Sequence, residues 1–403
     1  MFQSIHDLAA KRRALTGGGR RTRLGFIAIA VAALAFPATA LAFGTFGSVK
    51  TSHTGGVVYG LAISDMNGDG KADIVAGNDS STNVPSGHIS LLLGKGNGSF
   101  KRQIKIADSK GPEGIAIGNF NGDKHKDFAV GNYNNGGSAS SVEIFLGRRT
   151  GGFKDAATIP VTPGAWLVKA TDLNRDGKTD LVVGNFDSTG PDAVAVLLGN
   201  GNGTFSGPHY YASSGGLYGL AVGRMNGDKR PDVVTEDGSD NVCVLLTHPN
   251  GSLAAPKCKV PVGASGSYNG LTLGDFNGDG KLDAAVTNTN NGGSGEQVLT
   301  MLGNGDGTLQ DSIPTSTGAL GLWAIGSGDF NRDGKLDVVV GNRNSPVGVG
   351  LLLGKGNGKF KAPKPYAGSD GPEAIVPGKI NSDKGLDLAV GTDSGVDVFV
   401  NQR

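Results

Sequence analysis

The sequence is poor in several kinds of residue, and each shortage limits what the protein can be. Only two of its 403 residues are cysteine, so at most one disulfide bond can form within the chain. Its net charge of +1 provides no broadly basic surface for nucleic acid. Aromatic residues make up only 6% of the chain, but short apolar runs such as DLVVG recur regularly enough to bury a core. We therefore expect a folded protein that does not bind nucleic acid.

Long apolar runs are also scarce, and the main one lies near the N-terminus. Six basic residues at positions 11–23 precede the apolar run 24–36, and a small-residue site ending at Ala42 follows it. This order is typical of a secretory signal, and the run is too short to span a bilayer comfortably. An uncleaved membrane anchor is the alternative. We predict that 1–42 is a signal peptide and that 43–403 is secreted, or held at the cell surface or in the periplasm, without membrane insertion.

Glycine, by contrast, is abundant, with 70 residues and no three-residue period, which excludes collagen. A nine-residue motif, DxNxDGKxD in its whole form, recurs seven times at spacings of 50 to 54 residues. Its copies begin at Asp65, Asn119, Asp172, Arg224, Asp275, Asp329 and Lys379. Apolar runs precede and follow each copy, and most units add two further runs around a glycine-rich turn such as LLLGKGNGSF. Four short strands per unit and a period near fifty predict an all-β, seven-bladed β-propeller.

The two ends of the chain complement each other. The seventh unit stops at VDVFVNQR, without the turn and the fourth strand of the other units. Residues 43–53, FGTFGSVKTSH, contain the GTF that opens the fourth run elsewhere. We therefore predict that this N-terminal strand completes the last blade by pairing with 396–401, which closes the ring and removes the open edge.

The two cysteines, Cys243 and Cys258, stand symmetrically about Asn250 and Gly251, as facing positions of a hairpin would. Export makes a disulfide bond between them possible, since disulfides persist in oxidising compartments. Two unpaired buried thiols are the alternative.

Four whole copies of the motif predict calcium sites. They place carboxylates at positions 1, 5 and 9, asparagine at 3, glycine at 6 and lysine at 7. Calcium takes six to eight oxygen ligands, which these side chains and the lysine carbonyl can supply while the ammonium points to solvent. An EF-hand is excluded because position 12 is Ala76, Val183, Val286 or Val340 rather than glutamate. A metal-free turn is the alternative. The ligands predicted for about four calcium ions are Asp65, Asn67, Asp69, Lys71 and Asp73; Asp172, Asn174, Asp176, Lys178 and Asp180; Asp275, Asn277, Asp279, Lys281 and Asp283; and Asp329, Asn331, Asp333, Lys335 and Asp337.

These DxNxDGxxD loops between apolar strands, together with turns such as LLGNGNGTF, resemble the FG-GAP or VCBS repeats of integrin α-subunit propellers and of many secreted bacterial and fungal proteins. The resemblance covers 43–403. It implies a seven-bladed propeller with calcium in the loops that join the first and second strands of the blades. It does not imply one activity, because the family includes lectins, adhesion modules and accessory parts of enzymes.

The other three copies have lost features that calcium needs. Position 1 is Asn119, Arg224 or Lys379, and position 6 is Lys124, Lys229 or Lys384. A β-carbon in the left-handed conformation costs about 1–2 kcal/mol, so we expect these loops to follow another path. Aspartates remain at position 5 (Asp123, Asp228, Asp383) and at position 9 (Asp127, Asp232, Asp387). Either the new lysine partly replaces the calcium charge, or these loops have decayed into solvated turns.

A second series of residues lies six positions before each motif, where the innermost strand begins. Its members are Tyr59, Glu113, Trp166, Tyr218, Asn269, Trp323 and Glu373, with Tyr268 beside Asn269. On the face opposite the calcium loops, these side chains should encircle the mouth of the central channel. Aromatic faces beside carboxylates and amides suit a carbohydrate. Alternatively, the large side chains only plug the channel.

A third series, thirteen positions after each motif start, is polar and lies on the same face. It comprises Asn78, Asn132, Asn185, Asp237, Asn288, Asn342 and Thr392. Asparagine also caps turns through its own backbone, so we expect most of these residues to be structural.

No catalytic arrangement stands out, since the chain has no HExxH, GxSxG or phosphate-binding loop and its histidines are scattered. Glu113 and Glu373 could act as an acid and base pair, but paired carboxylates on a binding rim are more often ligand contacts. We therefore predict an exported, calcium-binding propeller that acts as a binding module for an extracellular glycan. A protein-binding adhesion module and a propeller enzyme such as a polysaccharide lyase are the alternatives.

Overall fold

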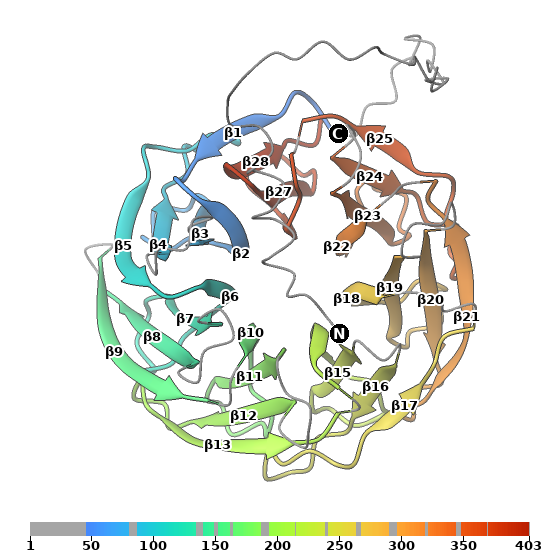
Figure 1. The fold of residues 1–403 in the computed structure, drawn as a ribbon, viewed down its shortest axis with the longest axis horizontal. Coiled ribbons are helices and arrows are strands. Elements are labelled where there is room, and N and C mark those ends of the chain that lie inside the picture. The colour runs from blue at the N-terminus through green and yellow to red at the C-terminus, as the bar shows by residue number, and fades with distance from the viewer. Residues whose placement is uncertain are drawn as a thin grey trace, which may run out of the picture.

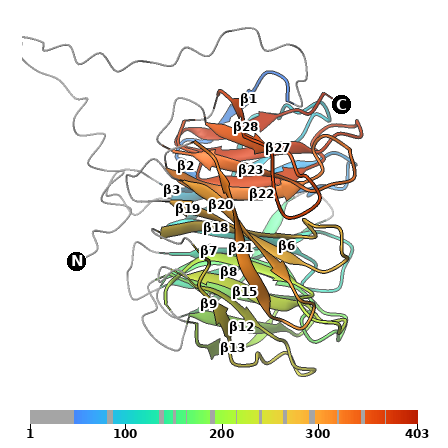
Figure 2. The same ribbon diagram turned by 90° about the vertical axis from the view of Figure 1, so that its right-hand side faces the viewer.

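The computed structural model shows seven four-stranded antiparallel sheets arranged as blades around a central axis (Figure 1). The residues that it describes are 46–79, 87–133, 140–148, 152–161, 164–186, 193–213, 215–237, 241–262, 267–289, 296–318, 321–343, 348–368 and 370–402. The predicted signal peptide lies outside them. Within these ranges the chain forms 28 strands and no helix, and thus no helix that could cross a membrane. Figure 2 shows the ring from its edge.

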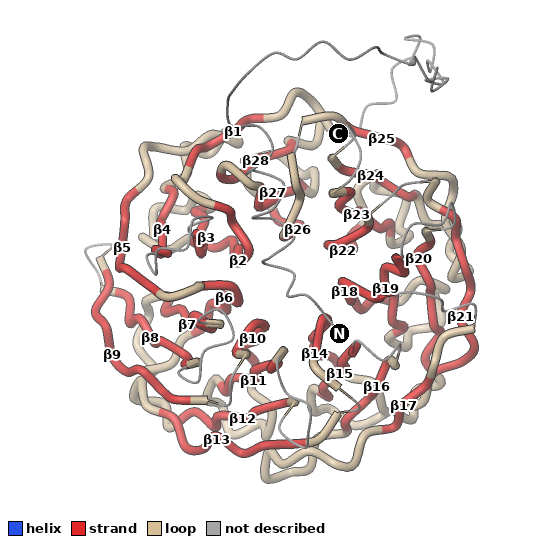
Figure 3. The backbone as a smooth tube through the Cα atoms, viewed as in Figure 1, coloured by secondary structure: helices blue, strands red, loops and turns tan. Residues whose placement is uncertain are grey.

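Each blade is a sheet whose strands run in order from the channel to the rim (Figure 3). The innermost strands of blades 1 to 7 are β2 (Val57–Ser64), β6 (Pro112–Gly118), β10 (Ala165–Thr171), β14 (Leu217–Gly223), β18 (Ser267–Gly274), β22 (Leu322–Gly328) and β26 (Ala374–Gly378). The second strands are β3 (Asp73–Asp79), β7 (Asp127–Asn132), β11 (Asp180–Asn185), β15 (Asp232–Asp237), β19 (Asp283–Thr289), β23 (Asp337–Asn342) and β27 (Asp387–Thr392). The third strands are β4 (Gly87–Leu92), β8 (Ser141–Gly147), β12 (Val194–Gly199), β16 (Val242–Leu245), β20 (Gln297–Gly303), β24 (Val349–Leu352) and β28 (Gly395–Phe399). The outer strands are β5 (Ile104–Ser109), β9 (Phe153–Pro160), β13 (Phe205–Tyr211), β17 (Lys257–Lys259), β21 (Leu309–Ser316), β25 (Lys364–Tyr366) and, in blade 7, β1 (Lys50–His53).

The hydrophobic core is a ring of interfaces between blades. The second strand of each blade is buried along its whole length. Both faces of this strand pack against neighbouring blades. Seven apolar clusters result, one between each pair of adjacent blades. Between blades 3 and 4, for example, Val182 and Val196 share a cluster with Val233 and Leu245. This explains why these strands read in the sequence as continuous apolar runs, without alternation between apolar and polar residues.

The predicted closure of the ring is confirmed. Strand β1 pairs with β28 in antiparallel register, with Lys50 opposite Val398 and Ser52 opposite Val396. A further bridge joins Phe46 to Asn401, and the N–H of Gly47 donates to the carbonyl of Val400 at 2.9 Å. Blade 7 is therefore built from both ends of the chain.

The disulfide alternative for the two cysteines is also confirmed. Cys243 of β16 faces Cys258 of β17 across the ladder, and the two form a disulfide bond. In a chain-entropy estimate, closing a loop of this length stabilises the fold by about 3 kcal/mol. The bond ties a three-residue outer strand to its blade.

Candidate functional site

Most of the residues predicted to encircle the channel mouth occupy β-bulges of the innermost strands, whereas Glu373 directly precedes the regular strand β26. In blade 1, the register between β2 and β3 shifts between Val58 and Gly60, which leaves Tyr59 as the extra residue. Equivalent shifts in blades 2, 3 and 4 leave Glu113, Trp166 and Tyr218 as the extra residues. A wider shift in β22 contains Trp323. A β-bulge re-aims the side chain of its extra residue, and here these side chains reach the channel.

These side chains line one cavity of about 170 Å³ at the centre of the ring. The lining includes Tyr59, Glu113, Trp166, Tyr218, Trp323 and Glu373. Tyr268 and Asn269 belong to β18, but their side chains lie outside the described part of the chain. Sequence spacing alone thus located residues from six blades that meet in space.

Aromatic residues from blades 2, 3, 4 and 6 form a connected group at the mouth. Trp166 contacts Tyr218, with ring centroids 5.8 Å apart, and reaches across the channel to Trp323 at 6.4 Å. Tyr133 and Phe186, from the loops after β7 and β11, complete the group at 6.3 and 4.4 Å from Trp166. The rings therefore narrow the channel as well as line it, which fits both the ligand platform and the plug predicted from the sequence.

Charged residues from blades 6, 7 and 2 lie beside this aromatic group. Arg343 makes an ion pair with the buried Glu373, and its guanidinium lies 4.3 Å from the centroid of the Trp323 ring. Burial, and then the nearby Glu373 and Glu113 carboxylates, raise the pKa of Tyr59 well above its usual range. The mouth thus places aromatic ring faces beside acidic side chains that can form hydrogen bonds.

The sequence prediction missed Arg343, Tyr133 and Phe186. All three stand fourteen positions after a motif start, directly after the polar third series, and Asp79 and Asp393 are their equivalents in blades 1 and 7. The same repeat alignment, read one position further, would have found them.

The third series itself is structural, as predicted for most of its members. The described side chains of this series are buried, from Asn78 at 0% exposed to Asn342 at 5%. The amide of Asn78, for example, donates to the carbonyls of Ala76 and His88 at 3.1 Å each and to the hydroxyl of Ser90 at 2.8 Å. These residues hold the strands together beneath the mouth.

The charged residues of the mouth predict a pH dependence of stability. Burial raises the pKa of Glu373 to about 7, although Arg343 opposes this shift. A carboxyl whose pKa is higher in the folded than in the unfolded state favours folding when protonated, so stability should fall as the pH rises from about 4.5 to above 7. The full effect is on the order of 3 kcal/mol. Denaturant unfolding at pH 5 and pH 8 should show a smaller fall for Glu373→Gln than for the wild type. Identical falls would contradict this assignment.

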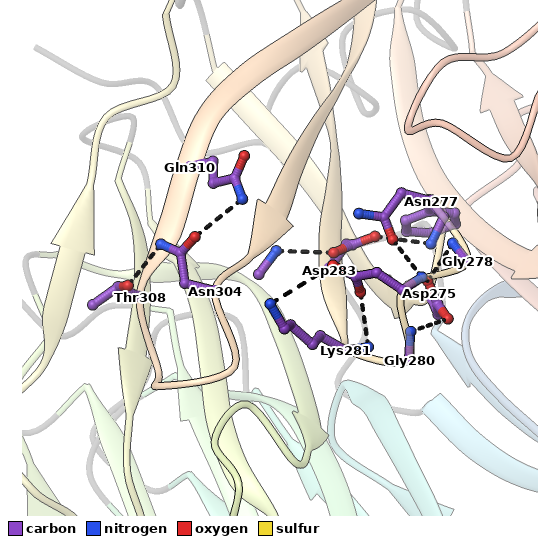
Figure 4. A network of polar contacts seen from close by, with 12 residues as sticks. Asp275, Asn277, Gly278, Gly280, Lys281, Asp283, Asn304, Thr308 and Gln310 are labelled. Atoms are coloured by element: carbon purple, nitrogen blue, oxygen red, sulfur yellow. Dashed lines mark hydrogen bonds and ion pairs between the residues drawn. The ribbon is translucent and has the colours of Figure 1, made fainter.

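The loops predicted to bind calcium lie between the first and second strands, and the loop of blade 5 shows their geometry (Figure 4). Asp275 accepts hydrogen bonds from the backbone N–H groups of 278–280 at 2.6, 3.1 and 2.8 Å. Asn277 accepts from the N–H of Asp279 at 2.9 Å, and Asp279 from the N–H of Lys281 at 2.9 Å. The loop is therefore wrapped around its own acidic side chains.

The aspartate at position 9 has a structural role in every blade. In blade 5, the buried Asp283 accepts from the N–H of Phe276 and from that of Gly303, each at 2.8 Å. The equivalent pairs of bonds occur in the other six blades. The carboxylate thus fastens the loop to the end of the third strand. This explains why position 9 keeps its aspartate where positions 1 and 6 of the motif have changed.

The four whole loops fit calcium by their donor chemistry. In each, carboxylate, amide and carbonyl oxygens lie within nine residues, which is the set that calcium prefers. In blade 5, burial and the neighbouring Asp279 and Asp275 raise the pKa of Asp283 to about 6. No three acidic, histidine or cysteine side chains of the described residues converge enough to hold a metal by themselves, so amide and carbonyl oxygens would have to contribute.

The lysine at position 7 is half-exposed and also lies near a loop carboxylate. The ammonium of Lys71 lies 3.6 Å from a carboxylate oxygen of Asp69, and Lys178 and Lys281 lie 3.6 and 3.8 Å from the matching aspartates. The position 5 carboxylate thus attracts the nearest cation of its own loop.

The repeated loop and its strands identify the family. The sequence profile described as the FG-GAP-like repeat matches residues 65–130, 119–183, 172–235, 225–286, 275–340 and 329–390, each from one loop to the second strand of the next blade. The chain belongs to the FG-GAP-like repeat family. No curated protein sequence matches it.

The degenerate FG-GAP-like loops do follow another path, as predicted. In the whole loops, the glycine at position 6 has a positive φ, for example 80° at Gly70 and 82° at Gly280. Among the described non-glycine residues only Arg175 and Arg332 have a positive φ, so the lysines at position 6 of the degenerate loops do not adopt this conformation.

That the lysines of the degenerate FG-GAP-like loops partly replace the calcium charge stays a prediction. No ion pair between described residues joins Lys124, Lys229 or Lys384 to a loop carboxylate. In blade 4 the cation that pairs with Asp228 is Arg230, at 2.5 Å. In blade 4, as in the whole loops, the residue at motif position 7 faces the position 5 carboxylate, and the lysine at motif position 6 does not.

Solved structures share the fold of this FG-GAP-like protein. The structure of BBS1N in complex with ARL6DN has a TM-score of 0.58 and 13% identity, over 89% of this chain and 97% of that chain. The BP39L lectin from Burkholderia pseudomallei has a TM-score of 0.55 and 16% identity, over 76% and 84%. The periplasmic gluconolactonase PpgL from Pseudomonas aeruginosa has a TM-score of 0.55 and 16% identity, over 82% and 87%. At these identities the likeness concerns the fold alone.

Proposed function

We propose that this protein is an exported, calcium-stabilised propeller that binds an extracellular glycan at the mouth of its central channel. The observation that carries the proposal is that aromatic and acidic side chains line the same mouth cavity. Trp166 and Tyr218 offer ring faces on which the C–H faces of a sugar can stack, while Glu113 and Glu373 accept hydrogen bonds from its hydroxyls. A lectin among the similar folds is consistent with this use of a propeller.

Export and calcium binding belong to the same proposal. The basic, apolar and small-residue order of 1–42 supports export, and the bond between Cys243 and Cys258 suits an oxidising compartment. In the whole loops, the oxygens of positions 1, 3, 5 and 9 and the carbonyl of position 7 would hold calcium. Bound there, the ion would neutralise the carboxylates crowded into each loop.

A glycan array, screened with the full chain, tests the binding proposal. We expect a defined set of glycans to bind, and Trp166→Ala to weaken that binding at least tenfold, because a buried tryptophan at the centre of a contact contributes about 2 kcal/mol or more. Tyr210→Ala is the matched control, since Tyr210 lies on the outer strand β13, away from the mouth.

Two results would count against glycan binding. One is an array without signal while the melting curve shows a folded protein. The other is an equal loss of affinity in the Trp166 and Tyr210 variants. Glycan products released during the assay would indicate an enzyme instead, with Glu113→Gln as the variant to examine.

A further inference from the structure

One lysine lies in the channel lining at a position that is uncharged in the other six blades. Lys169 of β10 lines the central cavity together with the mouth residues. Its equivalents on the other inner strands are Ala62, Ala116, Ala221, Thr272, Gly326 and Val376. The six uncharged equivalents indicate that propeller packing does not require a cation at this level. Lys169 is therefore a feature of this channel and not of the repeat.

The ammonium of Lys169 has no acidic partner. None of the ion pairs formed by the described residues includes it, and the carboxylates of Glu113 and Glu373 belong to the mouth end of the inner strands, several residues earlier in each blade. The side chain of Lys169 is exposed to solvent inside the channel, and partial desolvation by the surrounding strands lowers the pKa of its ammonium. A cation that lines a narrow channel without a counter-ion attracts an anion from the solvent.

The size and polarity of the cavity limit which anion can be taken. Its volume of about 170 Å³ compares with an engineered cavity of about 150 Å³ that holds one benzene ring, so a single six-membered ring fits. Glu113 and Glu373 in the same lining would repel a dianion such as a phosphate monoester. A single carboxylate, balanced by the single ammonium, is the anionic group that this arrangement favours.

We propose that the channel accepts the terminal hexuronate of an acidic glycan, with the sugar carboxylate paired to Lys169 and the sugar hydroxyls directed to the mouth. The inference rests on the proposed function, because the aromatic and acidic mouth supplies the rest of the glycan contact. It adds the chemical class of the sugar and the residue that selects it.

The experiment is an NMR titration of the full chain with methyl β-D-glucuronide and, separately, with methyl β-D-glucoside, which differ in the carboxylate alone. We expect the wild type to bind the glucuronide at least about tenfold more tightly, since a charge-assisted hydrogen bond is about twice as strong as a neutral one. Lys169→Met should abolish this preference while keeping the glucoside affinity. Lys169→Arg should keep most of it, and Lys101→Met, which changes an exposed lysine, should keep it all.

Equal affinity of the wild type for both sugars would overturn the inference and leave the proposed glycan site standing. A preference that survives in Lys169→Met would also overturn it, because the carboxylate would then be held elsewhere. Binding of neither sugar would reject the inference, and together with a silent glycan array it would reject the proposed function as well. Melting curves of the Lys169 variants, compared with the wild type, establish that each is folded.

Discussion

Replacing Asp283 with alanine is expected to lower the free energy of unfolding by about 3 kcal/mol, because two hydrogen bonds from buried backbone N–H groups to a charged acceptor are lost. The groups left without an acceptor are the N–H of Phe276, in the loop, and the N–H of Gly303, at the end of β20. Denaturant unfolding in the presence of a chelator measures this effect. A variant as stable as the wild type would show that the carboxylate does not fasten the loop.

Asp127→Ala is the matched control, because it removes the same two bonds, to Phe120 and Gly147 at 2.7 and 2.8 Å, in a blade whose loop lacks the calcium set. In chelator, both variants should lose similar stability. With excess calcium, the wild type and Asp127→Ala should gain stability by mass action, whereas Asp283→Ala should gain less. Melting temperatures that calcium and chelator leave unchanged would remove the metal from the proposal.

Replacing Phe46 with alanine is expected to destabilise the protein by about 3–5 kcal/mol, the usual range for a buried phenylalanine. Phe46 is 5% exposed, and its ring packs edge-on against Phe330, Tyr366 and Phe399 at centroid distances of 5.1 to 5.9 Å. These contacts hold the N-terminal segment between blades 6 and 7. Chemical denaturation measures the loss.

Phe100→Ala distinguishes closure of the ring from ordinary packing. Phe100 is 8% exposed and forms the bridge to Gly94 that corresponds to the bridge between Phe46 and Asn401. Both variants should lose similar stability. Only Phe46→Ala should speed hydrogen exchange of the β1 amides, because Phe46 anchors the N-terminal segment whose strand β1 pairs with β28. Equal protection of β1 in both variants would argue against this closing role.

Asn401 shows how the last blade compensates for its missing turn. In blades 5 and 6, the glycine-rich turn donates an N–H to the loop of the preceding blade, from Gly307 to Met225 and from Gly358 to Phe276, at 2.9 Å each. Blade 7 has no such turn, and the side-chain amide of Asn401 donates to the carbonyl of Phe330 at 2.8 Å instead. The defective seventh repeat thus keeps the contact between blades by other means.

Much of the fold followed from the sequence because its signals are local. The loop aspartates and glycines specify tight turns in chain order, and their period near fifty counts the blades. The matching ends of the chain predicted the strand that closes the ring, and the symmetry of Cys243 and Cys258 about Asn250 predicted two facing positions. For the mouth, the same alignment identified Trp166 and Trp323 as residues of equal position in their blades.

The contacts within the mouth were decided by tertiary structure alone. Trp166 and Trp323 are far apart in the sequence, and only the packing of seven blades brings their rings to 6.4 Å. The same packing places Arg343 over Trp323 and Lys169 in the channel lining, where no ion pair between described residues includes it. The sequence by itself determined the repeats, the turns and the closing strand, because each depends on neighbours along the chain. The channel and its charges depend on distances across the ring, which are fixed only when all seven interfaces between blades have formed.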